Sequence, residues 1–407
     1  MTTGSTVGQY EETAVVVASQ QRGEPAWLRD RRAEAARAFA ALPMPTPALR
    51  PWRYLDLAGL DLGTVAPGAV RVTVEGTLPA GVYAGSLAAG VAEISAVQAR
   101  LGSLLTATEG RFLAANAAQW SDGLLVYVPR GAVVEQPVQV TIDATAAAGG
   151  VAYPRVLIVA EEQGEVPIVL RLVSGDAPTV VVGAVEVSAA QASKVKLLID
   201  DRWGAQTRDF TWIRARLDRD ADVQIASIAL GGLVVKQTIE VLMEGEGASS
   251  GIRAVALGDA HQHFDFVTLQ DHVGPRTSSI VEVKSALAGA SRQAYYGVTR
   301  VSETAKGADA DQTNRNLLIS GEAKADSDPV LEILTADVVR CGHHAAVGPV
   351  DPEALFYLQS RGLDTRGALQ QLVAGFFHSV VSEAGTPGLD EDELTERVQA
   401  KLATASL

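Results

Sequence analysis

The chain has 407 residues, 47% hydrophobic and 20% charged, which is long enough for one large domain with attachments or for two to three domains. Its 34 basic and 48 acidic residues give a formal charge of −14, which excludes a grip on duplex phosphates as the main role. A single cysteine, Cys341, excludes an internal disulfide and any Cys₄ metal or iron–sulfur site built by this chain alone.

No stretch of the sequence is typical of a membrane span or a secretory signal. The longest run without a charged residue, residues 76–92, is too short to cross a bilayer and is broken by Pro79 and four glycines. No basic region precedes the short apolar run at residues 14–18. We therefore expect a cytoplasmic protein that crosses no membrane.

The N-terminal segment, residues 1–65, is predicted to be helical with a proline-rich linker. Apolar residues lie near one face at helical spacing over residues 25–42: Trp27, Leu28, Ala35, Phe39 and Leu42. Four prolines between residues 43 and 51 end this helix, because each lacks an amide N–H. Residues 66–122 give a mixed α/β signal, with a helix expected over residues 109–119.

Residues 123–346 are predicted to form strands. Eighteen valines fall between residues 123 and 200, and β-branched side chains at this density favour strands. Fifteen strand-like runs follow at intervals of about 14 residues, beginning near Leu124, Val138, Arg155, Val166, Thr179, Ser193, Arg208, Ala221, Val234, Ser250, His263, Ser278, Arg292, Ala310 and Ala323.

The arrangement of these strands points to a solenoid. Apolar and polar residues alternate within several runs, so each strand buries one face. No amphipathic helix interrupts the region, which excludes a βαβ sheet, and a sandwich or barrel usually closes with fewer strands. Similar strand–turn units that bury their apolar faces only against their neighbours predict a β-helix.

The last region, residues 347–407, is predicted to be helical. Asp351, Pro352 and Glu353 form a helix start that ends before Gly362. A second helix is expected from Thr365 to about Ser382, and a third from Leu389 to about Thr404.

The sharpest chemical feature is Cys341-x-His343 at the end of the strand-rich region. In a strand, residues two apart face the same way, so the two side chains can present sulfur and imidazole to one ligand. The competing interpretation is a buried cysteine beside a hydrogen-bonded histidine, because free cysteine is among the most buried residues. His344 points to the opposite face and is assigned a structural role.

A second polar cluster lies along the predicted strand that begins near residue 263. Alternation places three of its members on one face, which makes it either a metal site or the solvent face of a strand. Its members are His261, His263, Asp265, Asp271 and His272.

Two pairs of adjacent acids, Asp200-Asp201 and Glu161-Glu162, resemble the carboxylates of a glycosidase. Neighbours in a strand point to opposite faces, so neither pair can flank one glycosidic bond. The sequence also contains no G-x-x-x-x-G-K-[ST] loop and no G-x-S-x-G elbow, so nucleotide hydrolysis and α/β-hydrolase chemistry are not expected.

Four consecutive large apolar residues, Leu355 to Leu358, cannot all be buried by one helix face against one core. Two interpretations are open. In the first, some of these side chains contact a partner protein. In the second, two or three of them pack on the end of the solenoid and Tyr357 extends into solvent.

Several segments resemble the SufB/SufD family of iron–sulfur cluster assembly proteins. Residues 331–376 (LEILTADVVRCGHHAAVGPVDPEALFYLQSRGLDTRGALQQLVAGF) are similar to the family's C-terminal signature of LEI-x-A-D-D-V, Cys-x-His-Gly-Ala, Val-Gly and Leu-Phe-Tyr-Leu-x-Ser-Arg-Gly. DQTNRNLLIS, PAWLRDRR, PWRYLDL and GLLVYVPRGAVVEQPV also fit the family pattern. His344 departs from it, because the family commonly has glycine there, and Asp-Val-Val replaces Asp-Asp-Val.

Within the family, the chain resembles the SufD branch more than the SufB branch. Its length suits SufD, whereas SufB is longer and has additional cysteines. The Ala-Val-Gly after the histidines is also SufD-like.

The resemblance implies a right-handed parallel β-helix flanked by N- and C-terminal helical segments. It implies a non-catalytic subunit that pairs with a SufB-like chain through its last strands and docks a SufC-like ABC ATPase. The docking residues are Leu355, Phe356, Tyr357, Leu358, Ser360, Arg361 and Gly362. His343 and Cys341 correspond to the family's cluster-contacting histidine and interface cysteine.

The resemblance also implies that no cofactor is bound by this chain alone. Iron or a nascent cluster is held transiently at the partner interface, and a homodimer is a further possibility. Two rival hypotheses remain. One is a β-helix carbohydrate-active enzyme, a lyase or hydrolase, and the other is a diverged SufB acting alone, which the absence of further cysteines disfavours.

Overall fold

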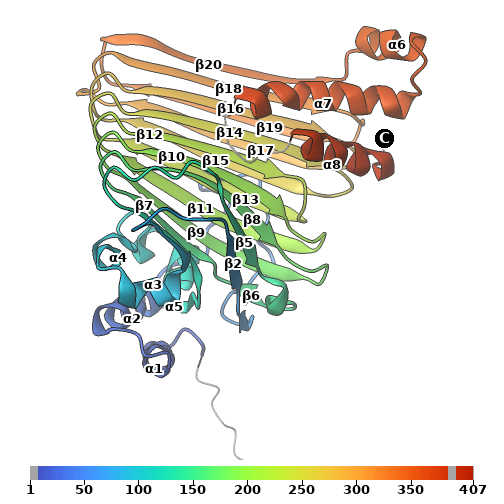
Figure 1. Ribbon diagram of the computed structural model, residues 1–407. Helices are drawn as coiled ribbons and strands as arrows, with labels where there is room; N and C mark the ends of the chain where they lie inside the picture. Colours follow the sequence, from blue (N-terminus) through green and yellow to red (C-terminus); the bar gives the residue numbers. More distant parts are fainter. Residues whose placement is uncertain (1–7, 384–390, 407) are drawn as a thin grey trace, which may run out of the picture.

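The computed structural model describes residues 8–383 and 391–406, and it is mainly β. Its core is a parallel β-solenoid in which successive strands alternate between two sheets (Figure 1). The predicted fold class, a parallel β-helix flanked by helical segments, is confirmed.

The strands of the solenoid form two sheets, called sheet A and sheet B. Sheet A runs in the order β19 (Lys324–Ile333), β17 (Arg292–Val301), β15 (His263–His272), β13 (Val234–Met243), β11 (Thr207–Leu217), β9 (Thr179–Ala189), β7 (Arg155–Ala160), β4 (Gly123–Val128) and β3 (Tyr83–Ser86), with β1 (Pro67–Gly68) and β6 (Val151–Ala152) at its side. Sheet B runs in the order β2 (Arg71–Glu75), β5 (Val138–Asp143), β8 (Glu165–Val173), β10 (Lys194–Arg202), β12 (Asp222–Ala229), β14 (Ser249–Gly258), β16 (Ser278–Leu287), β18 (Ala308–Leu318) and β20 (Val338–Pro349).

Each coil contributes one strand to each sheet. Val234 pairs with His263 and His263 pairs with Arg292, so neighbouring strands of one sheet are a full coil apart in sequence, with a strand of the other sheet between them. The fifteen predicted strand starts all fall within two residues of a strand start. The predicted interval between strand starts is therefore half a coil. Among the described strands, antiparallel pairing is found only at the end of each sheet, where β2 pairs with β5 and β3 pairs with β4.

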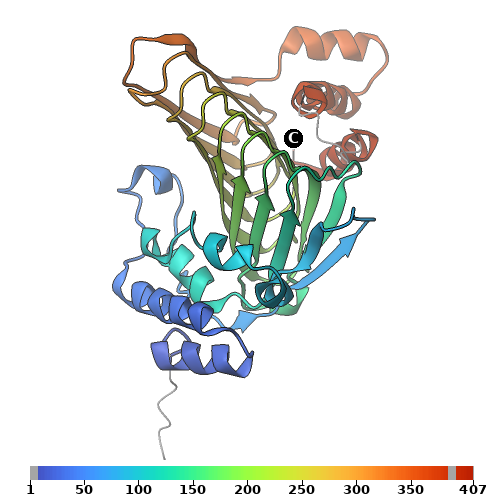
Figure 2. The same cartoon turned by 60° about the vertical axis from the view of Figure 1, so that its left-hand side comes forward.

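Tight corners keep the coils in register. Five corner residues other than glycine adopt positive φ, namely Gln163, Ala192, Asp220, Ala260 and Arg276. The amide N–H of Ala192 donates to the carbonyl oxygen of Arg219 in the next coil, and that of Asp220 donates to the carbonyl oxygen of Glu246. Left-handed corners thus pair their backbone groups between coils, so the backbone strain at each corner is offset by a ladder of hydrogen bonds. Figure 2 shows the turns between strands stacked along the solenoid.

The interior of the solenoid is filled by every second side chain of each strand. In the first coils this interior is aliphatic, with Val140, Ile158, Leu170 and Val187 fully buried. The period of two that the sequence shows is therefore the alternation between the interior and the outer faces.

Helices cover the outer face of sheet A near its first strands. They are α1 (Glu12–Gln21), α2 (Ala26–Ala41), α3 (Leu87–Glu93), α4 (Ala96–Arg100) and α5 (Arg111–Gln119), with the 3₁₀ turns η1 (Arg50–Trp52) and η2 (Ala107–Glu109). A third 3₁₀ turn, η3 (Thr145–Ala147), follows β5 and packs into the solenoid core through Ala147. The helices predicted at residues 25–42 and 109–119 are α2 and α5. Trp52 and Phe112 stack against each other and against Phe210 of β11, which ties this layer to the sheet.

The C-terminal helices α6 (Pro352–Ser360), α7 (Thr365–Glu383) and α8 (Glu391–Thr404) lie beside sheet B (Figure 1). The Asp351 carboxylate accepts the amide hydrogen of Glu353, as its predicted capping role requires. Val373 and Phe377 of α7 and Val398 of α8 pack on the outer face of sheet B. The predicted start of the third helix at Leu389 lies outside the described residues.

Candidate functional site at the open end of the solenoid

The last coil differs from all the coils before it. Within the described residues, β19 and β20 each pair with a strand on one side only. No side chain of either strand is fully buried, whereas most side chains of β15 to β17 are. Val339 is 72% exposed and Leu334 61% exposed. The solenoid is therefore open at this end, with unpaired backbone groups and apolar side chains at its edge.

Cys341 and His343 lie on the inner face of β20. Cys341 pairs in register with Ala310 and His343 pairs with Gln312, and both of these β18 residues are buried inside the solenoid. Cys341 packs against the small apolar cluster of Val301, Ala305 and Ala308 and is half-buried, while His343 is exposed. The two side chains thus share the mouth of the open end, as alternation along a strand predicts.

Partial burial raises the pKa of the Cys341 thiol, so the free group is protonated at neutral pH. A metal ion must displace that proton before the sulfur can bind it. In this state the thiol is a poor nucleophile, which disfavours the role of a reactive catalytic cysteine.

The interior beneath this pair is polar and uncharged. The Gln312 side-chain carbonyl accepts a hydrogen bond from Thr299 Oγ1 at 3.0 Å, and Asn316 donates to Asn314 at 2.7 Å. Gln312 Nε2 is buried without a hydrogen-bond partner. The last coils therefore replace the aliphatic interior with neutral amides and hydroxyls directly below Cys341 and His343.

The opposite face of β20 carries the neighbouring charged residues. Arg340 Nε donates to Asp309 Oδ1 at 2.9 Å, and His344 Nε2 lies 3.7 Å from Asp311 Oδ1. His344 therefore points away from Cys341 and His343, as its predicted position in the strand requires.

The histidine cluster near β15 does not assemble into one site. His261 lies in the turn before the strand, so the prediction that it shares a strand face with His263 and Asp265 is wrong. The Asp265 carboxylate forms an ion pair with Lys236 Nζ at 3.0 Å. His272 points into the interior, where its ring nitrogens contact the hydroxyls of two residues of the same coil. Among the described residues no group of three or more His, Cys, Asp or Glu side chains is arranged to hold a metal ion.

The side chains of Asp200 and Asp201 point to opposite faces of their strand, as alternation predicts. Asp200 faces outward, where Arg202 and Arg397 donate to it, while Asp201 is fully buried inside the solenoid. Glu161 and Glu162 lie in a turn rather than a strand. Neither pair flanks a cleft, so the structure gives no support to a glycosidase.

Sequence reasoning missed a second buried acid, Asp209, in the same interior as Asp201. Gln237 Nε2 donates to Asp201 at 2.6 Å and Thr211 donates to Asp209 at 2.6 Å. Burial raises the pKa of Asp201 and raises that of Asp209 to about 7. Both carboxyl groups are sealed inside the solenoid, away from any substrate.

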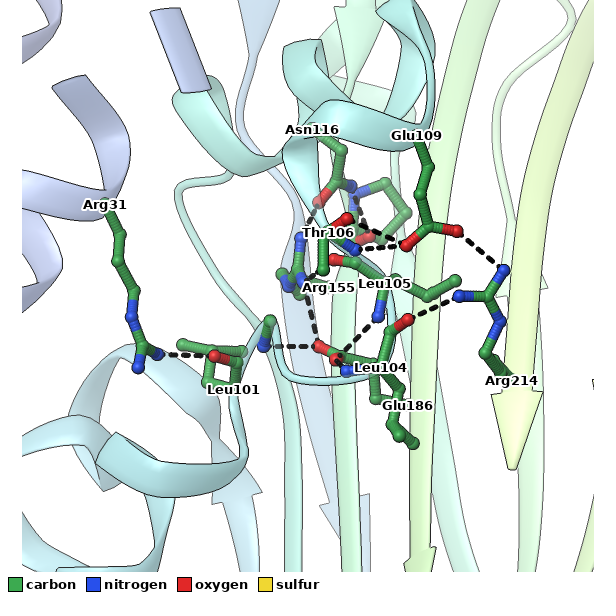
Figure 3. A network of polar contacts seen from close by, with 12 residues as sticks. Arg31, Leu101, Leu104, Leu105, Thr106, Glu109, Asn116, Arg155, Glu186 and Arg214 are labelled. Atoms are coloured by element: carbon green, nitrogen blue, oxygen red, sulfur yellow. Dashed lines mark hydrogen bonds and ion pairs between the residues drawn. The ribbon is translucent and has the colours of Figure 1, made fainter. Parts of the chain in front are cut away.

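A further buried network, also missed, anchors the N-terminal layer to sheet A (Figure 3). Arg155 of β7 forms an ion pair with Glu186 of β9 at 2.8 Å, and both side chains are almost fully buried. Arg155 also donates to Asn116 of α5 at 3.0 Å, and Glu186 accepts the amide hydrogens of the loop before η2. Sequence alone could not reveal these partners, because Arg155 and Glu186 lie on neighbouring coils and Asn116 lies on a helix outside the solenoid.

The predicted docking residues lie on a helix that stands away from the solenoid. α6 contains no buried residue, and Phe356 and Tyr357 are 71% and 61% exposed. Leu355 and Leu358 are half-buried, while Ser360, Arg361 and Gly362 are exposed at the end of the helix. Two large aromatic side chains therefore face solvent side by side. No helix in the described part of the chain combines the length and apolar content that a membrane crossing needs.

The fold and this end of the molecule define a class: a two-sheet parallel β-solenoid whose last coil exposes a cysteine, a histidine and unpaired strand edges. Comparisons with known proteins identify the family. Residues 142–376 match the profile of the SufBD core domain of the SUF iron–sulfur cluster assembly system, and residues 69–140 match the SufBD N-terminal region.

Two relatives illustrate the similarity. The iron–sulfur cluster assembly SufBD family protein Mb1497 of Mycobacterium bovis is 31% identical over 372 residues, covering 86% of this chain and 87% of the relative. The iron–sulfur cluster assembly protein SufB of Bacillus subtilis is 27% identical over 282 residues, covering 68% of this chain and 59% of that protein. The chain belongs to the SufBD family of iron–sulfur cluster assembly proteins.

Proposed function

We propose that this chain is the SufD-type, non-catalytic subunit of an iron–sulfur assembly scaffold that pairs with a SufB-like chain through its open end. One observation carries the proposal: Cys341 and His343 face the mouth of a solenoid whose edge strands β19 and β20 lack outer neighbours among the described residues. A partner that adds strands there covers the exposed apolar edge and satisfies the free backbone groups. A second copy of this chain is the alternative occupant when the partner is scarce.

The donor count explains why a partner is needed. A cluster of the [2Fe–2S] or [4Fe–4S] type is commonly held by four protein ligands. Cys341 and His343 supply one thiolate and one imidazole, so the remaining ligands come from the partner. Iron and sulfide are the cargo of this site, which forms only when the two chains meet.

The exposed helix α6 supports the second contact of the scaffold, with a SufC-like ABC ATPase. Phe356 and Tyr357 provide large apolar surface at low conformational cost, which is typical of interface anchors. α6 follows β20 after two residues, so force on this helix passes directly to the strand that carries the site. Dimerisation of two ATPase copies on binding ATP would then twist the interface and open it to iron and sulfur.

The test is anaerobic reconstitution of the complex that co-purifies with tagged chain. We expect His343→Ala and Cys341→Ser to lower the iron–sulfur absorbance several-fold at equal complex yield. His344→Ala is the matched control, because it removes the adjacent imidazole on the opposite face of β20 and should leave the absorbance unchanged. Wild-type cluster content in the His343→Ala complex would show that the ligand assignment is wrong. Failure of any SufB-like chain to co-purify would refute the scaffold role itself.

A further inference from the structure

The two free strand edges at the open end of the solenoid differ in what they offer a partner strand. One belongs to β19 in sheet A and the other to β20 in sheet B (Figure 1). β19 carries four charged residues and a proline, Pro329, near its middle. Charged side chains and proline discourage pairing at a sheet edge. In β20, the residues from Cys341 to Val347 include no proline, acid, lysine or arginine.

The hydrogen bonds to β18 show which backbone groups of β20 face outward. Successive residues of a strand direct their N–H and C=O groups to opposite sides. Directly after β20, the amide of Val350 donates to the carbonyl oxygen of Leu318 of β18 at 3.3 Å. The pairing with β18 is regular back to Arg340, so the even-numbered residues of this stretch face β18. The backbone groups on the free side belong to the odd-numbered residues: Cys341, His343, Ala345 and Val347.

The same counting places the proline of β19 on its free side. The amides of Lys324 and Leu334 donate to the carbonyl oxygens of Ser291 and Val301, toward β17. The even-numbered residues of β19 therefore face β17, and Pro329 belongs to the outward row. Because proline has no N–H, this row is broken near its centre and can pair only in two short pieces.

The outward row of β20 has defined limits. The register of β20 on β18 shifts by one residue at Val339, which has no partner on β18. Such a bulge bends the strand and ends regular pairing. At the other end, Pro349 offers no N–H to the free side. Between these limits, residues 343–347 are all exposed, so a second strand has access to them.

Cys341 and His343 belong to this row and to the mouth of the solenoid at once. Their side chains face inward, and their backbone groups face the free edge. A strand that hydrogen-bonds to them lies about 4.8 Å away, with every second side chain directed into the same mouth. A slip of one residue would turn those side chains to the outer face. The pairing register on β20 therefore decides which partner side chains meet Cys341 and His343.

We propose that β20 is the strand on which the SufB-like partner adds its edge strand, through the backbone groups of Cys341, His343, Ala345 and Val347. The inference rests on the proposed function, which supplies the partner, and adds the strand and the backbone groups that fix the register. The pieces of β19 on either side of Pro329 can pair alongside without fixing it.

The experiment is hydrogen exchange of individual amides, in the chain alone and in the complex that co-purifies with it. We expect the amides of His343, Ala345 and Val347 to exchange about tenfold or more slowly in the complex, because each gains a hydrogen bond. The amides of His344 and Ala346 already bond to β18, so they should change much less. This alternation along one strand is the signature of pairing at β20, and its measurement needs no substitution.

Ala345→Pro removes one outward N–H and leaves the hydrogen bonds to β18 intact, so we expect it to weaken the complex about tenfold. Ala325→Pro is the matched control, because it removes an outward N–H from β19 and should weaken the complex less.

The proposal is overturned, with the scaffold role intact, if the SufB-like complex forms without alternating protection in β20. It is also overturned if Ala325→Pro weakens the complex as much as Ala345→Pro. A dimer of this chain that binds no SufB-like chain would overturn the stated partner. If no second polypeptide binds at all, both this inference and the proposed function fail.

Discussion

Replacing Glu186 with glutamine tests whether the buried network of Figure 3 holds the N-terminal layer on the solenoid. Glu186 Oε2 accepts from Gly102 N and from Arg155 Nη2, both at 2.8 Å. Its Oε1 accepts from Leu104 N at 2.9 Å and from Leu105 N at 3.1 Å. All these partners belong to the loop before η2 or to the neighbouring strand.

The expected loss follows from these four contacts. Glutamine keeps the volume of glutamate and one carbonyl oxygen, so the substitution opens no cavity and two of the hydrogen bonds can persist. The amide NH₂ then faces two donors, and the buried Arg155 loses the one carboxylate that forms an ion pair with it among the described residues. Removing one partner of a buried ion pair costs about 3–5 kcal/mol, so we expect the free energy of unfolding to fall by about that amount.

The assay is urea denaturation followed by circular dichroism, with hydrogen exchange of residues 101–119 as the local probe. Glu162→Gln is the control, because Glu162 forms an exposed ion pair with Arg130 at 2.9 Å and such pairs contribute about 0–1 kcal/mol. The reasoning is refuted if Glu186→Gln costs no more than this control and leaves the exchange of residues 101–119 unchanged.

Three further predictions concern other parts of the molecule. Burial raises the pKa of Asp209 to about 7, so between about pH 4 and pH 7 the folded chain keeps a proton that the unfolded chain has released. The free energy of unfolding that this group contributes is therefore fully present at low pH and is lost as the pH rises to about 7. Asp209→Asn should therefore be more stable than wild type at pH 8, by up to roughly 4 kcal/mol, with the gain shrinking toward pH 4 in urea titrations; a constant difference would contradict it. Lys401→Met should speed amide exchange of α8 about tenfold or more, because the ammonium donates to Leu257 O and Gln262 Oε1 at 2.5 and 2.6 Å; unchanged exchange would refute this anchoring role. Phe356→Ala should lower the yield of co-purified ATPase while moving the unfolding midpoint little, since the ring is 71% exposed; normal yield would argue against docking at α6.

The strands were predictable because their signal is local. Alternation between interior and outer faces, together with valine-rich composition, places fifteen strand starts within two residues. The same alternation puts Cys341 and His343 on one face and His344 on the other. It failed at His261, since a two-residue corner precedes β15 and the strand begins later than the polar pattern.

Contacts between coils were not predictable, because the coil length varies. Arg208 pairs with Val234 in one coil, whereas Arg292 pairs with Lys324 in a later coil that is several residues longer. A drift of even one residue exchanges the inner and outer faces, so pairs such as Arg155 and Glu186 cannot be matched from sequence. The left-handed corners carry no composition signal either, since alanine, aspartate and arginine occupy them as well as glycine.

The two ends of the solenoid differ in whether their edge strands are covered, and this difference indicates which end is available to a partner. At the first end, β2 and β3 close the sheets by antiparallel pairing, and helices cover the neighbouring outer face. At the last end, the chain turns aside after β20, and α7 and α8 pack on the outer face of sheet B instead of covering the open coil (Figure 1). Solenoids generally need a polar cap at each end to stay soluble, and an uncovered edge invites pairing with other strands. The uncovered edge, which carries Val339 and Leu334 near Cys341 and His343, is therefore the end of the solenoid at which the proposed partner would add its strands.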